Sequence, residues 1–262
     1  MTNALVDFWS GFQRGEAPHV HPDDEEFLRK IGKTLPQVEA RNFHSFIRGN
    51  DFGKRDGRLH VSLLPAPYLG DLERADIFVL LLNPGVAPHS YLEQTDRRYL
   101  RMWENTVRQR LAGEEFPNHS IDPRNAWSGA YHWWEKKFRS IAAKLVETKA
   151  QPNYYSALRE ISRRVAAIEL CPYHSVSRPD LGLIGQLPST DAARKFLKQD
   201  LLPRAREARA IILVTRSSKH WSDCFPGNRD GVYVYDQGQA RSASFSHKFD
   251  GKAPIEQRLC PP

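Results

Sequence analysis

A continuous apolar run, Ile77 to Leu82, constrains the fold of this chain more than any other segment. An apolar run of this length between polar flanks is typical of a strand covered on both faces, as in a parallel sheet. The run stops at Asn83-Pro84-Gly85, where proline cannot continue the ladder of hydrogen bonds and glycine lets the backbone approach a ligand closely. Ligands of open α/β sheets bind at the carboxyl ends of the strands. The sequence therefore predicts that Asn83 lies at the edge where such folds do chemistry, although the same residues also suit an ordinary turn.

Further apolar strands alternate with helical segments along the sequence. Such alternation predicts an α/β fold, because each helix connects two strands and covers one face of the sheet. We expect a three-layer αβα sandwich with a short, mostly parallel central sheet, formed by a single domain over residues 1–262 with a helical N-terminal region over residues 1–53. The expected strands are Arg58–Leu64 at an edge, Ile77–Leu82, Val165–Leu170, Ala210–Val214 and Val232–Tyr235. The expected helices include Arg97–Ala112, Gly129–Thr148 and Asp191–Ala208.

The chain is basic and poor in cysteine. Its formal net charge is +7 and its isoelectric point is about 9.4, and arginines supply most of the excess. A basic surface favours a polyanionic partner, nucleic acid first, although a solvated basic face without a partner gives the same composition. The three cysteines show neither zinc nor disulfide spacing, no segment reaches membrane-spanning length, and the mixed, amphipathic first residues lead us to expect no leader peptide. We therefore expect a cytoplasmic monomer that needs no metal, cofactor or membrane.

Three motifs follow one another in an order that points to one family. They are Leu82-Asn83-Pro84-Gly85, then Ser128-Gly129-Ala130-Tyr131-His132-Trp133-Trp134 with Phe138, and finally Ile168-Glu169-Leu170-Cys171-Pro172. Together they resemble the uracil-DNA glycosylase superfamily, most closely its single-strand-selective and mismatch-specific branches, over the span from Asp76 to Ser246. In that family the first motif activates water, the second begins a helix and the third reads the base. The resemblance implies the fold expected above and a monofunctional DNA glycosylase, a hydrolase that cleaves a flipped base from its deoxyribose.

The sequence departs from the family's pattern at two places. Glu169 stands where the family usually has the asparagine of His-Asn-Leu-Cys-Pro. The usual final motif, His-Pro-Ser-Pro, is absent, and Arg241-Ser242-Ala243-Ser244 is its best positional substitute. The resemblance implies catalytic roles for Asn83, Glu169 and Arg241. Contacts to the substrate are then expected from Pro84, Gly85, Cys171, Pro172, Ser242 and Ser244.

The chemistry of base release suits these residue types. Hydrolysis passes through an oxocarbenium-like sugar, and negative charge develops on the leaving base. Asn83 suits the positioning of a water, and Arg241 suits the stabilisation of the anion because guanidinium stays charged. Tyr91 and Tyr99 follow the Asn-Pro-Gly turn and are candidates to stack on the flipped base, with a plain core role as the alternative. The expected DNA-binding residues, which include those that fill the space left by the base, are Arg216, Ser217, Lys219, His247, Lys248 and Phe249.

Glu169 constrains the substrate most. Cytosine carries an exocyclic amino group, from which a carboxylate accepts a hydrogen bond. Burial favours the protonated acid, which donates to N3 or transfers its proton to the leaving base, whereas uracil is matched only by the protonated form. We therefore expect a modified cytosine-type base, which would suit defence against phage whose DNA carries such bases. The alternative is a structural glutamate paired with an arginine such as Arg178.

Other functions fit parts of this pattern. A uracil-DNA glycosylase of base-excision repair would use the same strand ends. A catalytically inactive member of the fold that binds nucleic acid or another partner would explain the missing His-Pro-Ser-Pro motif. A nucleotide or nucleoside hydrolase would place its substrate at the same edge of the sheet. Release of a base from DNA separates the glycosylases from the other two.

Overall fold

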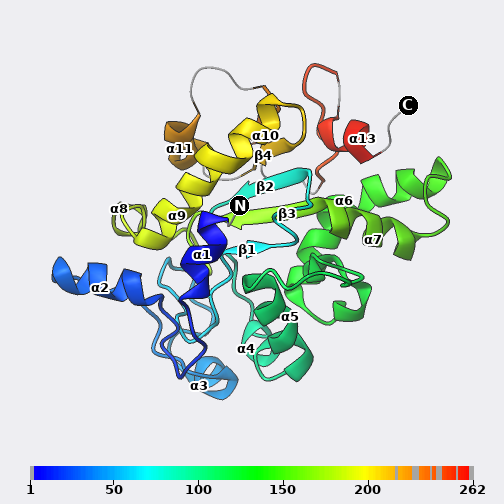
Figure 1. Ribbon diagram of the computed structural model, residues 1–262. Helices are drawn as coiled ribbons and strands as arrows, with labels where there is room; N and C mark the ends of the chain where they lie inside the picture. The colour runs from blue at the N-terminus through cyan, green and yellow to red at the C-terminus, as the bar shows by residue number, and fades with distance from the viewer. Residues whose placement is uncertain are drawn as a thin grey trace. The chain divides into compact units, whose positions relative to one another are not determined.

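The computed structural model describes residues 3–215, 218–225, 230–236, 238–239, 244–251 and 253–259 (Figure 1). The chain is mixed α/β with a mostly parallel five-stranded sheet in the order β1-β3-β2-β4-β5, so the predicted fold class is confirmed. Every residue of β2 and β4 is buried, which explains why both strands are unbroken apolar runs in the sequence. The strands are β1 (Tyr68–Leu69), β2 (Ile77–Leu81), β3 (Val165–Glu169), β4 (Ile211–Val214) and β5 (Val232–Val234).

The register of the sheet aligns the carboxyl ends of its strands. β2 and β4 are parallel, with Leu80 opposite Val214. β4 and β5 are also parallel, with Val214 opposite Val234. The residue after β4, Thr215, donates its backbone N–H to the Leu80 carbonyl (3.2 Å). Residues that follow β2 and β4 therefore leave the sheet on the same side, at the carboxyl ends of the strands.

The chain divides into two compact units, and the first comprises Met1–Tyr68, Leu81–Arg110 and Ile168–Asp200. Asparagine or aspartate side chains cap the amino ends of several of its helices, and α3 has a complete capping box. The single domain predicted from the sequence stays a prediction. The helices of this unit are α1 (Ala4–Ser10), α2 (Pro22–Lys30), α3 (Phe43–Arg48), α4 (Ser90–Glu93), α5 (Arg97–Val107), α8 (Leu181–Ile184) and α9 (Pro188–Phe196).

The second unit comprises Leu69–Leu80, Leu111–Ala167 and Leu201–Pro262. Its longest helix, α6, begins where the Ser128 hydroxyl accepts a hydrogen bond from the Tyr131 N–H (3.1 Å). The apolar face of α6 buries Trp134 and Phe138, as its spacing predicts. Its helices are α6 (Gly129–Glu147), α7 (Tyr154–Arg164), α10 (Leu202–Arg206), α11 (Ser218–Trp221) and α13 (Pro254–Leu259), with 3₁₀ turns η1 (His119–Ile121), η2 (Pro123–Asn125) and η4 (Ser222–Cys224).

Two predicted elements differ from the structure. The edge strand expected over Arg58–Leu64 is wrong, because only isolated bridges form there, from Leu59 to Gln37 and to Ser175. The helix expected over Asp191–Ala208 is interrupted by a π-helical turn, η3 (Leu197–Leu201). Pro203 follows that turn and has no backbone N–H to donate to a preceding carbonyl, which favours the local change of hydrogen bonding.

Candidate active site

The carboxyl ends of β2 and β3 lie side by side. Near their starts, the Asp76 N–H donates to the Arg164 carbonyl (3.1 Å). At their ends, the Cys171 N–H donates to the Leu82 carbonyl (2.8 Å). Both strands therefore run in the same direction, and the polar residue at the end of each, Asn83 after β2 and Glu169 in β3, belongs to one edge of the sheet.

The side chain of Asn83 is held in one orientation. Its Nδ2 donates to the Ser175 hydroxyl (2.8 Å) and to the Pro84 carbonyl (3.0 Å). A carbonyl oxygen only accepts, so the group that faces Pro84 must be the NH₂ of the carboxamide. Ser175 is fixed in turn, because its hydroxyl donates to the Ser177 carbonyl and its N–H donates to the Pro84 carbonyl (3.1 Å). No hydrogen bond from the described part of the chain reaches Asn83 Oδ1, so this oxygen is available to accept one from a water.

His174 holds the same turn from a second position. Its Nδ1 lies 3.0 Å from the Gly85 carbonyl oxygen and its Nε2 lies 3.0 Å from the Leu64 carbonyl oxygen. Burial lowers the pKa of His174, so the ring is neutral at pH 7 and donates to one carbonyl at a time. The segment Cys171–Ser175 thus runs along Leu82–Gly85 and contacts it through two backbone and two side-chain groups. Sequence reasoning singled out neither His174 nor Ser175 as a site residue.

Glu169 is the buried carboxylate of this edge. Its side chain belongs to a residue that is 8% exposed, and its N–H donates to the Pro67 carbonyl (2.9 Å). Burial raises the pKa of the Cys171 thiol far above its ordinary range, and the negative charges of Asp24 and Glu169 raise it further. Cys171 is therefore a neutral thiol at pH 7 and a poor nucleophile. Pro172 is also buried, and its carbonyl accepts a hydrogen bond from the Ala66 N–H (2.9 Å), so neither residue is a reacting group.

The two tyrosines after the Asn-Pro-Gly turn have different surroundings. Tyr91 is buried, its ring stacks on Phe46 (centroids 4.8 Å apart) and its hydroxyl lies 2.7 Å from Nδ1 of His60. It therefore fills the core role that the sequence left as the alternative. Tyr99 is half-buried in the first turns of α5, and burial raises its pKa, so its hydroxyl stays protonated. Of the two, Tyr99 keeps the candidacy for stacking on a base.

Open space lies beside Gly85 in the turn after β2. Pro84 is half-buried and Gly85 is exposed. A Cβ added to Gly85 would meet no atom within 4 Å of the residues that surround it. The backbone conformation of Gly85 is not left-handed, so the turn itself does not require glycine. Glycine at this position instead leaves the turn uncovered, as the approach of a ligand requires.

The remaining predicted residues belong to the second unit or lie outside the described residues. Arg216, Ser217, Arg241 and Ser242 are in the latter group. The Ser244 hydroxyl lies 2.8 Å from that of Ser140, and Lys219 is exposed on α11. Lys248 is exposed, whereas His247 and Phe249 are half-buried and pack together (centroids 5.1 Å apart).

That packing bears on the expected filling of the space left by a flipped base. The Phe249 ring also contacts Tyr233 and Tyr235, each with centroids 5.2 Å away. Insertion of Phe249 into DNA would therefore have to break three ring contacts. Lys248 is the residue of this segment that stands free of the aromatic cluster.

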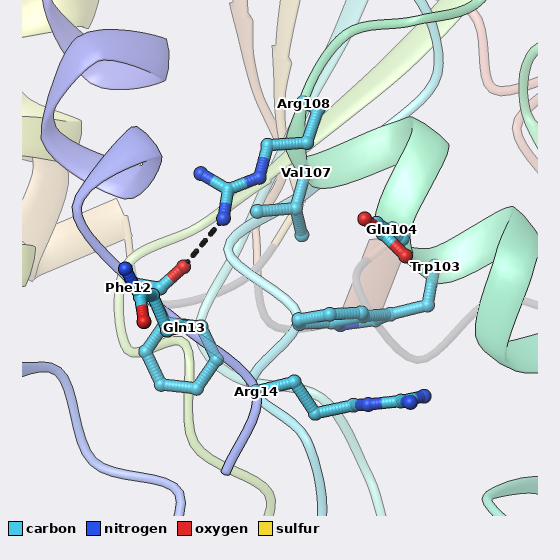
Figure 2. A pocket seen from close by; sticks show the side chains of 7 residues that line it. All are labelled: Phe12, Gln13, Arg14, Trp103, Glu104, Val107 and Arg108. Atoms are coloured by element: carbon cyan, nitrogen blue, oxygen red, sulfur yellow. Dashed lines mark hydrogen bonds between the residues drawn. The ribbon is translucent and has the colours of Figure 1, made fainter.

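A cavity of about 250 Å³ lies between the end of α1 and α5 in the first unit (Figure 2). Figure 2 shows the Arg108 guanidinium turned toward Phe12, where it donates to the backbone carbonyl (2.7 Å). It also donates to the Ser10 carbonyl, and Trp103 Nε1 donates to the Pro65 carbonyl (2.7 Å). Arg108 thus joins the end of α5 to the end of α1, and Trp103 joins α5 to the segment that contains Pro65. The lining residues are Phe12, Gln13, Arg14, Trp103, Glu104, Val107 and Arg108.

No protein-family model, curated protein or solved structure matches the chain in the three comparisons. Within the described ranges, no group of three or more His, Cys, Asp or Glu residues is placed to hold a metal ion. No helix among the residues that the structure describes is long and apolar enough to cross a membrane.

Proposed function

We propose that the protein is a monofunctional DNA base glycosylase that hydrolyses the bond between deoxyribose and a flipped, modified cytosine-type base. The observation that carries the proposal is the locked carboxamide of Asn83 at the end of β2, beside the buried Glu169 of β3. Proteins that act on a base take it out of the stack into a pocket lined by hydrogen-bonding groups. The edge of the sheet supplies such groups from two neighbouring strands.

Asn83 and Arg241 have separate roles in the proposed reaction. A water donates a hydrogen bond to Asn83 Oδ1 and is positioned by it. The oxygen of this water forms the new bond to C1′ of the sugar. The bond from C1′ to the base breaks and the electron pair leaves with the base. One water proton stays on the new C1′ hydroxyl, and the other passes to the base anion. Asn83 is too weak a base to take a proton from the water before the transition state, so the reaction requires a base that departs readily. Arg241, known here from the sequence alone, supplies the charge that stabilises the anion.

Glu169 reads the base in this proposal. As a carboxylate it accepts from the exocyclic amine of cytosine, and as an acid it donates to N3 or protonates the base as it leaves. A modified cytosine as substrate would suit defence against phage with modified DNA, whereas an unmodified or deaminated base would suit repair.

Incision at abasic sites tests the proposed reaction. The protein is incubated with oligonucleotides that carry one cytosine, one modified cytosine or one uracil, and alkali then cleaves the strand wherever a base was lost. We expect cleavage at a modified cytosine without a lyase product before the alkali treatment. Cleavage at uracil alone would favour the repair alternative, and no cleavage on any substrate would favour an inactive nucleic-acid-binding protein.

Substitution of Glu169 is expected to change the preferred base. Glu169→Asn offers an NH₂ donor to O4 and an acceptor to N3–H, which is the pattern of uracil, and one good hydrogen-bonded pair gives roughly 1–3 kcal/mol of discrimination. The ratio of cytosine-type to uracil release should therefore fall about tenfold or more. Glu169→Gln, of matched length, keeps one hydrogen bond and loses proton transfer. If the ratio is the same in wild type and both variants, Glu169 is structural and the substrate assignment is wrong.

DNA binding is expected to weaken steeply with salt. Each phosphate contact made by lysine or arginine releases counterions, and the slope of log affinity against log salt is about −0.9 per contact for duplex DNA. The exposed Lys219 and Lys248 of the second unit are candidates for such contacts. Titration of a labelled duplex at about 50 and 200 mM salt should show an affinity loss of about fortyfold or more if three or more contacts form. An affinity that does not change over this range would contradict an electrostatic interface.

A further inference from the structure

The loop after α3 presents an unusual aromatic side chain. Phe52 is 51% exposed, more than any other large hydrophobic residue that the structure describes. Its ring meets the ring of Phe46 at 89° with centroids 5.7 Å apart, and Phe46 stacks on the buried Tyr91. Phe52 is therefore anchored to the core while half of its surface faces solvent.

The same loop carries more positive than negative charge. Arg58 donates to the carboxylates of Asp51 (2.6 Å) and Asp56 (2.9 Å), and these hydrogen bonds hold the pKa of both acids below its usual range. Lys54 also pairs with Asp51 (3.4 Å), so Arg58 and Lys54 together offset the two carboxylates and Arg55 leaves the loop with a net positive charge. Lys54 and Arg55, the two cations next to Phe52 in sequence, are exposed.

This loop lies against the segment that holds Asn83. The Ser177 N–H donates to the Asp56 carbonyl (3.1 Å), and a Cβ added to Gly57 would stand only 2.2 Å from the carbonyl oxygen of the exposed Arg178. Ser177 in turn accepts the hydrogen bond of the Ser175 hydroxyl that positions Asn83. The loop that carries Phe52, Lys54 and Arg55 is therefore connected through its backbone to the candidate active site.

We propose that Phe52, Lys54, Arg55 and Arg178 form a surface that binds single-stranded nucleic acid, with Phe52 stacking on a base that flanks the reacting nucleotide. Proteins that bind single strands combine cations that follow the backbone with aromatic rings on which bases stack. A lone ring among exposed cations fits a nucleotide chain better than a protein partner, which needs a larger apolar patch. The proposal deepens the proposed function and rests on it for the identity of the polymer.

Binding of a labelled single-stranded oligonucleotide to the full chain tests this surface, with fluorescence anisotropy as the readout. Phe52→Ala is expected to weaken binding about tenfold, because one base loses its stacking partner. Phe52→Trp should bind at least as tightly as wild type. Arg55→Gln leaves the ring in place and removes one cation. It should reduce the magnitude of the slope of log affinity against log salt by about 0.7. An abasic oligonucleotide of the same length should bind wild type and Phe52→Ala equally, because it has no base to stack.

Tyr155→Ala is the matched control. Tyr155 is 38% exposed and meets Phe116 at 78° with centroids 5.2 Å apart, so it repeats the anchoring of Phe52 in the other unit. An affinity of Phe52→Ala within twofold of wild type, an equal loss in Tyr155→Ala, or no binding of single strands by wild type would each overturn the proposal. Base release is measured on the same variants. If the protein releases a base but its affinity for single strands does not depend on Phe52, the proposed binding surface is wrong and the glycosylase proposal stands. If binding depends on Phe52 but no base is released, the glycosylase proposal is wrong and the binding surface stands.

Discussion

Asn83→Ala is expected to lower the single-turnover rate of base release by about a thousandfold while leaving DNA affinity within a few fold of wild type. The reason is geometric: the carboxamide oxygen of Asn83 is the group that the turn holds ready for a water, and alanine has no replacement for it. Single-turnover measurements separate this effect from binding and product release. Wild-type turnover in Asn83→Ala would remove Asn83 from the mechanism.

Ser175 provides the graded control for this experiment. Ser175→Ala removes the acceptor at 2.8 Å from Asn83 Nδ2, but the Pro84 carbonyl at 3.0 Å still holds the amide. We expect a smaller loss of rate, about tenfold, with unchanged affinity for DNA. Ser175→Thr keeps the hydroxyl and should recover most of the rate. Equal losses in Ser175→Ala and Ser175→Thr would mean that this position acts through packing and not through the hydrogen bond.

Asp24→Ala is expected to cost at least about 3 kcal/mol of unfolding free energy. Asp24 is fully buried and accepts three hydrogen bonds, from the N–H (2.9 Å) and hydroxyl (2.6 Å) of Ser189 and from the hydroxyl of Tyr173 (2.6 Å). Alanine would leave these three donors buried without an acceptor, and each such donor costs about 1–3 kcal/mol. Tyr173 lies in the segment that holds Asn83, so the substitution should also loosen the candidate site. Urea denaturation of wild type and variant measures the difference.

The pH dependence of this effect has a definite sign. Burial raises the pKa of Asp24, although the hydrogen bonds from Ser189 and Tyr173 oppose it. A raised pKa in the folded state means that the stabilisation is fully present below the unfolded value of about 4 and is lost as pH rises through the folded value. Asp24→Asn is isosteric and neutral, so its unfolding free energy has no contribution from the titration of this side chain. Wild type should therefore gain stability relative to Asp24→Asn as pH falls from 7 to 4, and a constant difference, or a gain in the opposite direction, would contradict this account.

The strands could be predicted where burial alone determines them. β2 and β4 are covered on both faces, so their sequences are continuous apolar runs that local pattern reveals. β1 consists of Tyr68 and Leu69 only, which is too short to show a period. The error over Arg58–Leu64 has the opposite cause: the pattern suits a strand, but the partners of Leu59 come from distant segments and form single bridges. The helix α7 was missed although its cap, Asn153, is a recognisable start signal.

The candidate site was predictable only in part. Asn83 and Glu169 follow from their places at strand ends, which the sequence shows directly. Ser175 could not be found in this way, because its bond to Asn83 joins residues 92 positions apart and depends on how the segment after β3 folds back along the turn. Tyr91 shows the converse: its place after the turn suggested a contact to the base, and only its packing on Phe46 and its bond to His60 reveal a core residue.

Identification of the released base tests the central claim most directly. The wild-type protein and Asn83→Ala are incubated with DNAs that contain ordinary, deaminated or modified cytosines, and the small molecules set free are identified by mass spectrometry. The account predicts a free modified cytosine-type base from wild type, an intact phosphodiester backbone, and no base above background from Asn83→Ala. No free base from any DNA, or equal release by the two proteins, would contradict it.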